Sequence, residues 1–261
     1  MSENWHPTPD LGHLPILTFH GFATPASTIS FPPSVLRGGL ARLVKKGYRS
    51  IDLLDAVEHL RTGDPVPPRA LVITIDDGYE SVYREAFPIL QEHGMTATVF
   101  VTTGEQPGRN PSDRFPSMEG QPMVSWKELS EMVAAGFSVG AHTLTHPDLT
   151  RLSASNAEAE IVGAKSILED RLGVGVRSFA YPHGKYDRRT HELVAEHYCC
   201  ACSDRLGLLA RGSNLYALER VEMYYFSRPW VFNLLTTPFL SAYLALRAVP
   251  RNARRAWARA R

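Results

Sequence analysis

The stretch "ALVITIDDGYESVYREAFPILQEHGMTATVFVTT" (residues 70–103) contains the pattern that decides the fold. A β-rich apolar run ends at Asp76, a helical pattern follows and ends at Gly94, and a second β-rich run then begins. Similar β-rich runs alternate with helical patterns along the chain. This alternation is typical of strands that are connected by helices, so it predicts a largely parallel sheet or barrel.

The expected strands and helices follow from these two patterns. The β-rich runs are 15–20, 70–76, 96–103, 137–142, 177–182, 198–203 and 216–223, with 48–51 as a weaker eighth. The helical patterns cover 36–47, 55–63, 81–94, 126–135, 155–173 and 188–197. Ser125 and Glu128 have the spacing of a capping box, which predicts that a helix begins directly after Ser125.

The length of 261 residues suits a single α/β barrel domain, since such domains commonly take about 200–250 residues. The composition, 44% hydrophobic and 21% charged, is that of an ordinary globular protein. We predict an N-terminal segment (1–13), a barrel domain (14–228), and a C-terminal helical tail (229–261) that is first apolar and then rich in arginine.

The C-terminal tail differs in charge from the rest of the chain. Its last fifteen residues hold six arginines and no acid, so subtracting these six charges from the net +1 leaves −5 on residues 1–246. The uncharged stretch 229–246 approaches the length of a membrane span, but Asn233 and Pro238 interrupt it. Two interpretations stay open: a terminal helix packed on the barrel, and an interfacial helix whose basic tail meets anionic lipid.

The first residues, "MSENWHPTPDLG" (1–12), lack the basic and apolar regions of a secretory signal. We therefore expect a cytoplasmic protein, peripheral at the inner membrane face if the tail is interfacial. No nucleic acid partner is expected, and the sequence does not indicate an oligomeric state.

Polar residues stand at the C-terminal ends of four predicted strands. They are His20, the adjacent Asp76 and Asp77, His142, and His183. In a parallel barrel these strand ends open onto one face, where catalytic groups collect. We therefore expect side chains from distant parts of the sequence to meet in one site.

Two adjacent carboxylates repel each other when both are desolvated, so a positive charge is expected beside Asp76 and Asp77. His142 and His146, four residues apart, can present two imidazoles on one side of a turn. Pro147 argues against a continuing helix, so a turn is expected after the strand. Two imidazoles and one carboxylate leave a coordination position open for water, which is typical of a catalytic zinc site. The other aspartate would then act as the general base.

The segments "LPILTFH" (14–20), "VITIDDGY" (72–79), "VGAHTLTHPDL" (139–149) and "FAYPHGKYD" (179–187), in this order, resemble the polysaccharide deacetylases, also called carbohydrate esterase family four. Asp-Asp-Gly alone is common as a turn, and a histidine pair alone is common on a helix face; the combination is what makes the resemblance specific. It extends over residues 14–223. It implies a distorted (β/α) barrel of about seven parallel strands and metal-dependent removal of acetyl groups from N-acetylated sugars.

The resemblance also implies roles for the strand-end residues. Asp76 matches the family's catalytic base, and Asp77, His142 and His146 match its metal ligands. Zinc is the first expectation for the divalent metal, and cobalt, nickel or iron would also suit this donor set. The metal would polarise the amide carbonyl, Asp76 would take a proton from the attacking water, and a backbone N–H of the turn at His183 would bind the oxyanion.

The sequence departs from the family pattern in two places. Ala180 stands where the family commonly has an arginine that orients the base, and we expect Arg220 to replace it by pairing with Asp76. The alternative for Arg220 is a structural salt bridge. The family's late Leu-x-His is also missing, so His20 is the first candidate for the general acid and His183 the second.

Aromatic residues near the strand ends are candidates for the sugar site, although such residues also serve as core. The predicted substrate-binding residues are Tyr79, Trp126, Tyr181 and Pro182. The substrate class is an N-acetylated glycan or a lipid-linked sugar.

Three other functions remain open at this point. The first is a deacetylase-like protein that binds glycans without catalysis, and the second is a hydrolase of a small cyclic amide or ureide on the same fold. The third, an iron oxygenase with two histidines and one carboxylate, would more often be expected on an antiparallel jelly roll.

Overall fold

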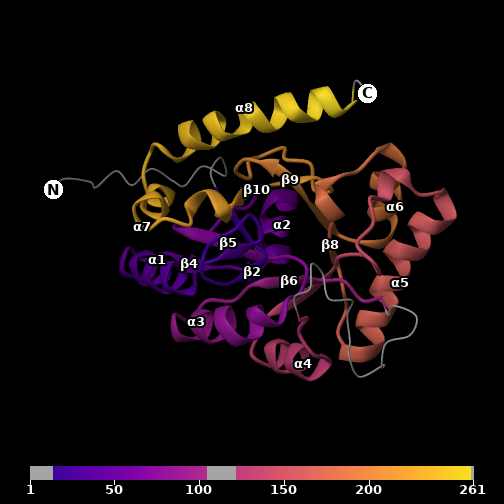
Figure 1. The fold of residues 1–261 in the computed structure, drawn as a ribbon, viewed down its shortest axis with the longest axis horizontal. Helices are drawn as coiled ribbons and strands as arrows, with labels where there is room; N and C mark the ends of the chain where they lie inside the picture. Colours follow the sequence, from indigo (N-terminus) through magenta and orange to yellow (C-terminus); the bar gives the residue numbers. More distant parts are fainter. Residues whose placement is uncertain (1–13, 105–121, 260–261) are drawn as a thin grey trace.

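The computed structural model describes residues 14–104 and 122–259, which form a closed parallel barrel surrounded by helices (Figure 1). The barrel strands of this described part are β1 (Ile16–Phe19), β5 (Ala70–Ile75), β6 (Thr98–Val101), β7 (Ser138–Ala141), β8 (Ser178–Ala180), β9 (Cys200–Leu206) and β10 (Leu218–Glu222). Their order is β1-β10-β9-β8-β7-β6-β5, and β1 also pairs with β5, which closes the ring. The predicted distorted (β/α) barrel of about seven parallel strands is confirmed.

Short elements are attached to this ring. The weaker eighth strand exists as β4 (Arg49–Ser50), which pairs with the start of β5 but takes no part in closing the barrel. A second, parallel pair is formed by β2 (Gly21–Phe22) and β3 (Ser30–Phe31), directly after β1. The 3-10 turns η4 (Leu149–Arg151), η5 (Pro182–Gly184) and η6 (Met223–Phe226) follow β7, β8 and β10 in the chain.

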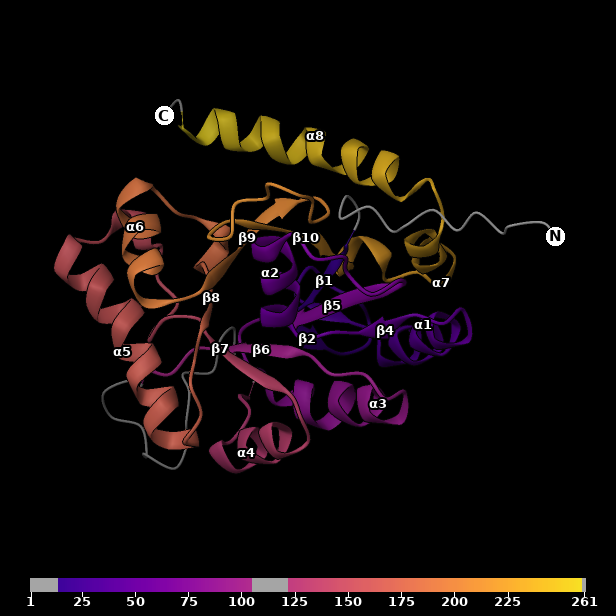
Figure 2. The same ribbon diagram turned by 180° about the vertical axis from the view of Figure 1, so that it is seen from behind.

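Helices surround the barrel, and one of them, α2 (Leu53–Thr62), packs on the strand residues of the barrel interior (Figures 1 and 2). They are α1 (Pro33–Lys45), α2 (Leu53–Thr62), α3 (Phe87–Glu92), α4 (Trp126–Ala134), α5 (Ala154–Leu172) and α6 (Arg188–His197). The capping box of Ser125 and Glu128 is present at the start of α4. The helix predicted at 81–94 is instead divided into a π-helical turn, η2 (Val82–Ala86), and α3. Pro88, which has no N–H to donate, stands in the first turn of α3.

Alternation along the strands divides the core into two clusters, because successive side chains of a strand point to opposite faces. The first cluster joins one set of strand residues to α2, and it includes Ile16, Val72, Phe100, Ala180, Leu218, Leu53 and Val57. The second joins the alternate strand residues to the outer helices, and it includes Leu17, Ile73, Val99, Phe179 and Val221. The first cluster therefore fills the barrel interior.

The C-terminal segment runs along the outside of the barrel. It forms α7 (Pro229–Phe232), the 3-10 turn η7 (Asn233–Thr236) and α8 (Leu240–Arg259), and α8 contacts β9 and η7. This agrees with the interpretation of a terminal helix packed on the barrel. Among residues 14–104 and 122–259, no helix combines the length and the apolar character that crossing a membrane requires. The predicted N-terminal segment, 1–13, lies outside the described residues.

Candidate active site

The polar residues of the site continue the inward-facing rows of the barrel strands. Because strand side chains alternate, Val72, Thr74 and Asp76 lie on one side of β5 and its continuation. The same spacing carries His20 above β1 and Arg220 into the site from β10. The interior is therefore apolar at the end near α2 and polar at the C-terminal ends of the strands, as the sequence predicted.

Asp77, His142 and His146 come together as a candidate metal centre. One side-chain ligand atom of each residue lies within 4.8 Å of the others. The Nε2 atoms of His142 and His146 are 3.4 Å and 3.6 Å from Oδ1 of Asp77. Two imidazole nitrogens and a carboxylate oxygen fit a divalent transition metal, and three protein ligands leave a position for water or substrate.

The protonation states suit metal binding. Nδ1 of His142 donates to the carbonyl oxygen of Ala180 at 2.7 Å, which leaves Nε2 as the atom that can ligate. Burial, together with the neighbouring His142, lowers the pKa of His146 to about 3, so this imidazole is neutral near pH 7. Burial alone would raise the pKa of Asp77, but the adjacent histidines outweigh it and hold that pKa below its usual range.

The backbone around these ligands is strained. Asp77, Thr143, His146 and His183 have φ angles of 73°, 67°, 59° and 56°, in the left-handed region that non-glycine residues rarely adopt. Each such residue costs of order 1–3 kcal/mol, and such strain concentrates at functional sites. The segment from His142 to His146 is a turn rather than a helix, which confirms the prediction made from Pro147.

One acidic residue of α5 holds this turn in place. Glu160 accepts hydrogen bonds from the backbone N–H groups of Leu144 and Thr145 at 2.8 Å and 2.9 Å, and from the Thr145 hydroxyl at 2.7 Å. These two residues lie between His142 and His146. Glu160 is therefore a positioning residue for the ligand turn, and the sequence analysis missed it.

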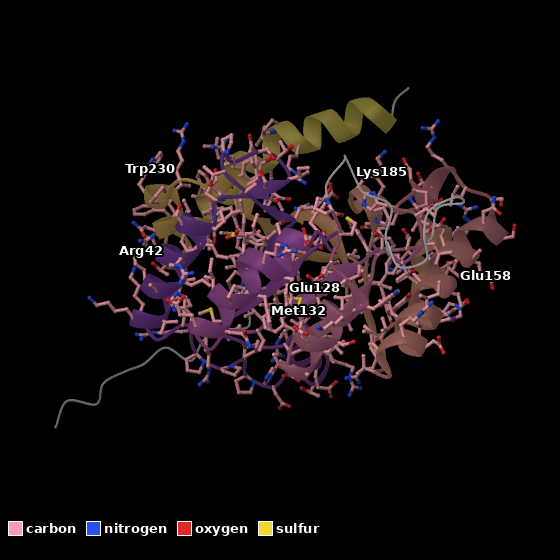
Figure 3. All side chains as sticks on the ribbon, turned by 60° about the horizontal axis from the view of Figure 1, so that its bottom comes forward. Arg42, Glu128, Met132, Glu158, Lys185 and Trp230 are labelled. Atoms are coloured by element: carbon pink, nitrogen blue, oxygen red, sulfur yellow. The ribbon has the colours of Figure 1, made fainter. Side chains whose placement is uncertain are left out.

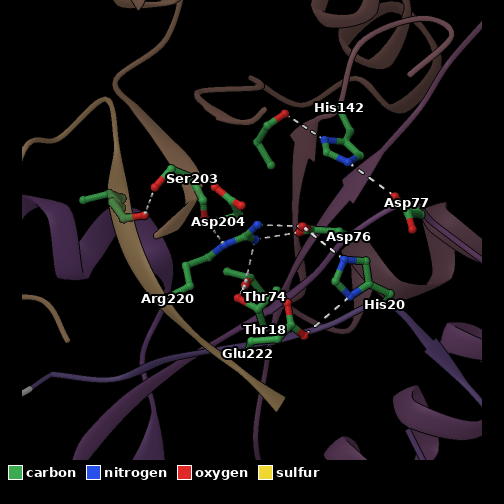
Figure 4. A network of polar contacts seen from close by, with 12 residues as sticks. Thr18, His20, Thr74, Asp76, Asp77, His142, Ser203, Asp204, Arg220 and Glu222 are labelled. Atoms are coloured by element: carbon green, nitrogen blue, oxygen red, sulfur yellow. Dashed lines mark hydrogen bonds and ion pairs between the residues drawn. The ribbon is translucent and has the colours of Figure 1, made fainter. Parts of the chain in front are cut away.

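Asp76 and Arg220 form a buried, two-point ion pair. Nη1 and Nη2 of Arg220 each lie 2.7 Å from one carboxylate oxygen of Asp76, and Nε donates to the carbonyl oxygen of Ser203 at 2.9 Å (Figure 4). Burial alone would raise the pKa of Asp76, but the Arg220 guanidinium lowers it further than burial raises it. Asp76 is therefore ionised. Arg220 pairs with it as predicted from the absence of an arginine at position 180.

His20 lies on the other side of Asp76. Its Nε2 is 3.9 Å from Oδ2 of Asp76, and its Nδ1 is 4.0 Å from Oε1 of Glu222 (Figure 4). Burial lowers the pKa of His20, but Glu222 and the two aspartates outweigh burial and raise it. Glu222 was missed in the sequence analysis, although it shares a face of β10 with Arg220, two residues away.

His183 stands in η5 and is the more exposed of the two candidate acids. Its ring centroid is 4.6 Å from that of His146, on the metal-ligand side. Burial and the nearby Lys185 lower the pKa of His183. The structure therefore brings both predicted acids to the site. Their surroundings raise the pKa of His20 and lower the pKa of His183.

A cavity of about 450 Å³ opens over these groups, which lies in the usual range of about 300–1,000 Å³ for ligand pockets. The predicted Tyr79 and Tyr181 line it, as do His183 and Gly184 of η5, whereas the predicted Pro182, the first residue of η5, is not among its described lining residues. The buried Tyr181 hydroxyl has no hydrogen-bond partner among the described residues.

Trp126 is not among the described residues that line this cavity. It begins α4, and the guanidinium carbon of Arg171 lies 5.7 Å from its ring centroid. Its ring packs beside Arg171 although the preceding residues 122–124 pair with 78–80 at the end of β5, so the structure gives the predicted sugar-binding role of Trp126 no direct support. The lining of the cavity also includes charged residues that the sequence did not indicate, among them Asp204 of β9 and Arg251 of α8.

Comparison with known proteins agrees with this geometry. The sequence model of the family described as Polysaccharide deacetylase matches residues 63–199, which is more than half of the chain. The protein named "Putative polysaccharide deacetylase YxkH" of Bacillus subtilis is 25% identical over 220 residues, covering 84% of this chain and 74% of that protein.

Two further relatives extend the comparison. The poly-beta-1,6-N-acetyl-D-glucosamine N-deacetylase of Staphylococcus aureus is 33% identical over 129 residues, which is 45% of this chain and 41% of that enzyme. Among solved structures, IcaB from Ammonifex degensii superposes with a TM-score of 0.71 at 25% identity, covering 87% of this chain and 98% of that one.

Proposed function

Because the chain belongs to the polysaccharide deacetylase family, we propose that it hydrolyses N-acetyl groups of an amino-sugar glycan or a lipid-linked sugar. The observation that carries this is the convergence of Asp77, His142 and His146 beside an ionised Asp76, at the base of an open cavity. The Staphylococcus aureus relative is named for poly-beta-1,6-N-acetyl-D-glucosamine, so β-1,6-linked oligomers are the first substrates to test.

Asp77, His142 and His146 would hold the divalent metal, with zinc as the first choice and cobalt, nickel or iron as alternatives. Such an ion supplies Lewis acidity, which polarises a carbonyl and lowers the pKa of water toward about 7. The chain contributes two imidazoles and an ionised carboxylate, and Glu160 fixes the turn that spaces the imidazoles.

Asp76 would act as the general base. Arg220 occupies both of its oxygens, but each carboxylate oxygen has a further lone pair, so one can still accept a proton from water. The attacking water adds to the acetyl carbonyl carbon, and its proton passes to Asp76. Arg220 keeps Asp76 ionised before this step and holds the carboxylate in a fixed orientation.

His20 would act as the general acid. Collapse of the tetrahedral intermediate breaks the C–N bond, releases acetate and leaves an amine that needs a proton. The raised pKa of His20 favours its protonated form, and its position 3.9 Å from Asp76 allows the proton to be recovered for the next cycle. The lowered pKa of His183 makes it the weaker candidate, and its backbone N–H remains the proposed oxyanion donor.

The test is acetate release from β-1,6-linked and β-1,4-linked N-acetylglucosamine oligomers, with and without a chelator, by wild type and Asp76→Asn. Loss of the base is expected to lower the rate by about 10²–10⁴-fold. Bound metal, measured by elemental analysis, should stay equal in the two proteins. Asp170→Asn, an exposed carboxylate on α5, is the matched control and should keep the wild-type rate.

Two outcomes would contradict the proposed reaction, and a third would contradict the role of Asp76. If the metal-loaded wild type released no acetate from any acetylated sugar but bound the oligomers, the glycan-binding alternative would be favoured. If instead it opened a small cyclic amide or ureide, the second alternative would replace the proposal. Equal rates for wild type and Asp76→Asn would remove Asp76 from the role of base.

A further inference from the structure

The C-terminal segment presents large apolar side chains to solvent. Trp230, Phe239, Leu246 and Val249 are 66%, 68%, 70% and 66% exposed, and we call these four the outer apolar face. Trp230 points away from the body of the protein (Figure 3). Leu246 and Val249, three residues apart on α8, are neighbours on the helix surface, and Trp230 and Phe239 add exposed apolar area in the same segment. Contiguous exposed apolar surface often marks an interaction site.

The geometry of α8 places this face opposite its packing face. With 3.6 residues per turn, Leu246 and Val249 lie on one side of the helix, and Leu240 and Leu244 lie on the other. Leu240 and Leu244 are buried against the barrel, at 7% and 3% exposure. The helix is therefore apolar on two sides, and only one of them is covered by the described part of the protein.

All charged side chains of the same segment are positive. Residues 229–261 contain six arginines and no aspartate or glutamate, whereas the rest of the chain has a net negative charge. A segment with exposed apolar side chains and a net positive charge is suited to the boundary between lipid headgroups and acyl chains. Anionic headgroups would complement the arginines.

We propose that the outer apolar face, together with the net positive charge of the C-terminal segment, docks this protein on an anionic lipid bilayer. A second copy of the chain is the less favourable occupant, because a two-fold interface would bring the same arginine-rich helix from each copy together. An acidic protein surface would neutralise the positive charge of the segment, but it would leave the exposed Trp230 and Phe239 without an apolar partner.

Docking would also bring the cavity close to the membrane. Arg251 of α8 lines the cavity, and its Nη2 donates to the carbonyl oxygen of Asp204 at 3.0 Å. The helix that meets the lipid therefore also forms part of the cavity wall. This consequence rests on the proposed function and favours a lipid-linked amino sugar as substrate, whereas the docking itself does not depend on catalysis.

Flotation of the full-length protein with phosphatidylcholine vesicles, with and without phosphatidylglycerol, tests the proposal. Wild type should bind the anionic vesicles at least about tenfold more tightly than the neutral ones, and less tightly as salt is raised. The double variant Leu246→Ser/Val249→Ser should lose about tenfold or more of this binding. Val44→Ser, which changes an exposed apolar residue of α1, is the control and should bind like wild type.

Acetate release from a soluble oligomer separates docking from catalysis, and the double variant should keep the wild-type rate. Equal binding of wild type and double variant to anionic vesicles would overturn the proposal, as would failure of both to bind. A wild-type dimer in solution that the double variant dissociates, with no vesicle binding, would show that a second copy covers the outer apolar face instead.

Discussion

Asp76 and Asp77 are neighbours in sequence, yet they belong to two differently built halves of the site. Asp76 faces β10 and β1, where Arg220 supplies a complete, fixed positive charge at 2.7 Å from each of its oxygens. Asp77 faces the turn after β7, where two imidazoles stand 3.4 Å and 3.6 Å from its Oδ1. Arg220 neutralises the charge of Asp76. Asp77 lies where it could bind the same cation as the two imidazoles.

This difference explains how two adjacent buried carboxylates can both be ionised. Buried like charges would otherwise force one of them to stay protonated. It also predicts that the two halves can be damaged separately. Changes around Asp76 should alter rate and pH dependence at constant metal content, and changes around the ligand turn should alter metal affinity at constant pH dependence.

The largest effect is expected for Arg220→Met. Without the guanidinium, burial would raise the pKa of Asp76 relative to wild type and the carboxylate would lose its fixed orientation, so acetate release should fall by about 10²–10⁴-fold. Removing one partner of a buried pair should also cost about 3–5 kcal/mol of unfolding free energy. The lowered pKa of Asp76 stabilises wild type above the ordinary pKa of 3.8, and this gain is lost as the pH falls through the native value.

Denaturant unfolding and elemental analysis check this prediction together with the rate. Metal content should be unchanged in Arg220→Met. Arg188→Met, which removes an exposed arginine paired with Glu192 on α6, is the control and should have no measurable effect. A variant at Arg220 that lost its metal would show that the two halves are not separable.

An intermediate effect is expected for Glu160→Ala. The variant loses three hydrogen bonds to Leu144 and Thr145, so the spacing of the two imidazoles is no longer fixed. Partners of this kind usually contribute about 10–100-fold to metal affinity. Competition with a chromophoric chelator should show that loss, and saturating metal should restore most of the rate.

Two matched variants sharpen this experiment. Glu160→Gln keeps an acceptor oxygen and should recover part of the affinity. Glu158→Ala changes an exposed acid of the same helix and should leave the affinity at the wild-type value. Unchanged metal affinity in Glu160→Ala would show that the ligand turn keeps its shape without the carboxylate.

The two halves also differ in how far the sequence could predict them. In the metal half, His142 and His146 are four residues apart and Asp77 directly follows Asp76, so these two short motifs were informative without any structure, although Asp77 and His142 are 65 residues apart. Arg220 was predicted only as a strand-end candidate, because it lies 144 residues from Asp76 and only closure of the barrel brings them together. The parallel barrel itself was accessible because alternation of strand and helix predicts parallel strands.

Glu222 and Glu160 were not predicted, and the predicted Trp126 lies elsewhere. Glu222 could have been found, because the two-residue period of β10 puts it on the same side as Arg220. Glu160 carried no signal, because an acidic residue on a long helix is typical of a solvated face. Trp126 was given a sugar-binding role from its place near a strand end, but the start of α4 directs it toward Arg171 instead.

The smallest effect, and the one that decides between the two candidate acids, is expected for Glu222→Gln. Burial lowers the pKa of His20 and Glu222 is the first of the groups that raise it, so removing this charge should lower that pKa. A protonated acid is needed, so the alkaline limb of the rate profile should move to lower pH, while the acidic limb set by Asp76 stays in place. Glu219→Gln, on the same strand and adjacent to Arg205, is the control and should leave both limbs unchanged.

The stability of the protein should also depend on pH through His20, because the pKa of His20 is raised in the folded state. Its contribution to the free energy of unfolding is fully present below its ordinary pKa of 6.5 and is lost as the pH rises through the native value. Glu222→Gln should shrink this pH-dependent part, and unfolding of wild type and variant at several pH values measures it. If the variant showed the stability change but kept the wild-type alkaline limb, His20 would titrate as described without donating the proton. His183 would then be the general acid, and the proton would be delivered from the metal half of the site.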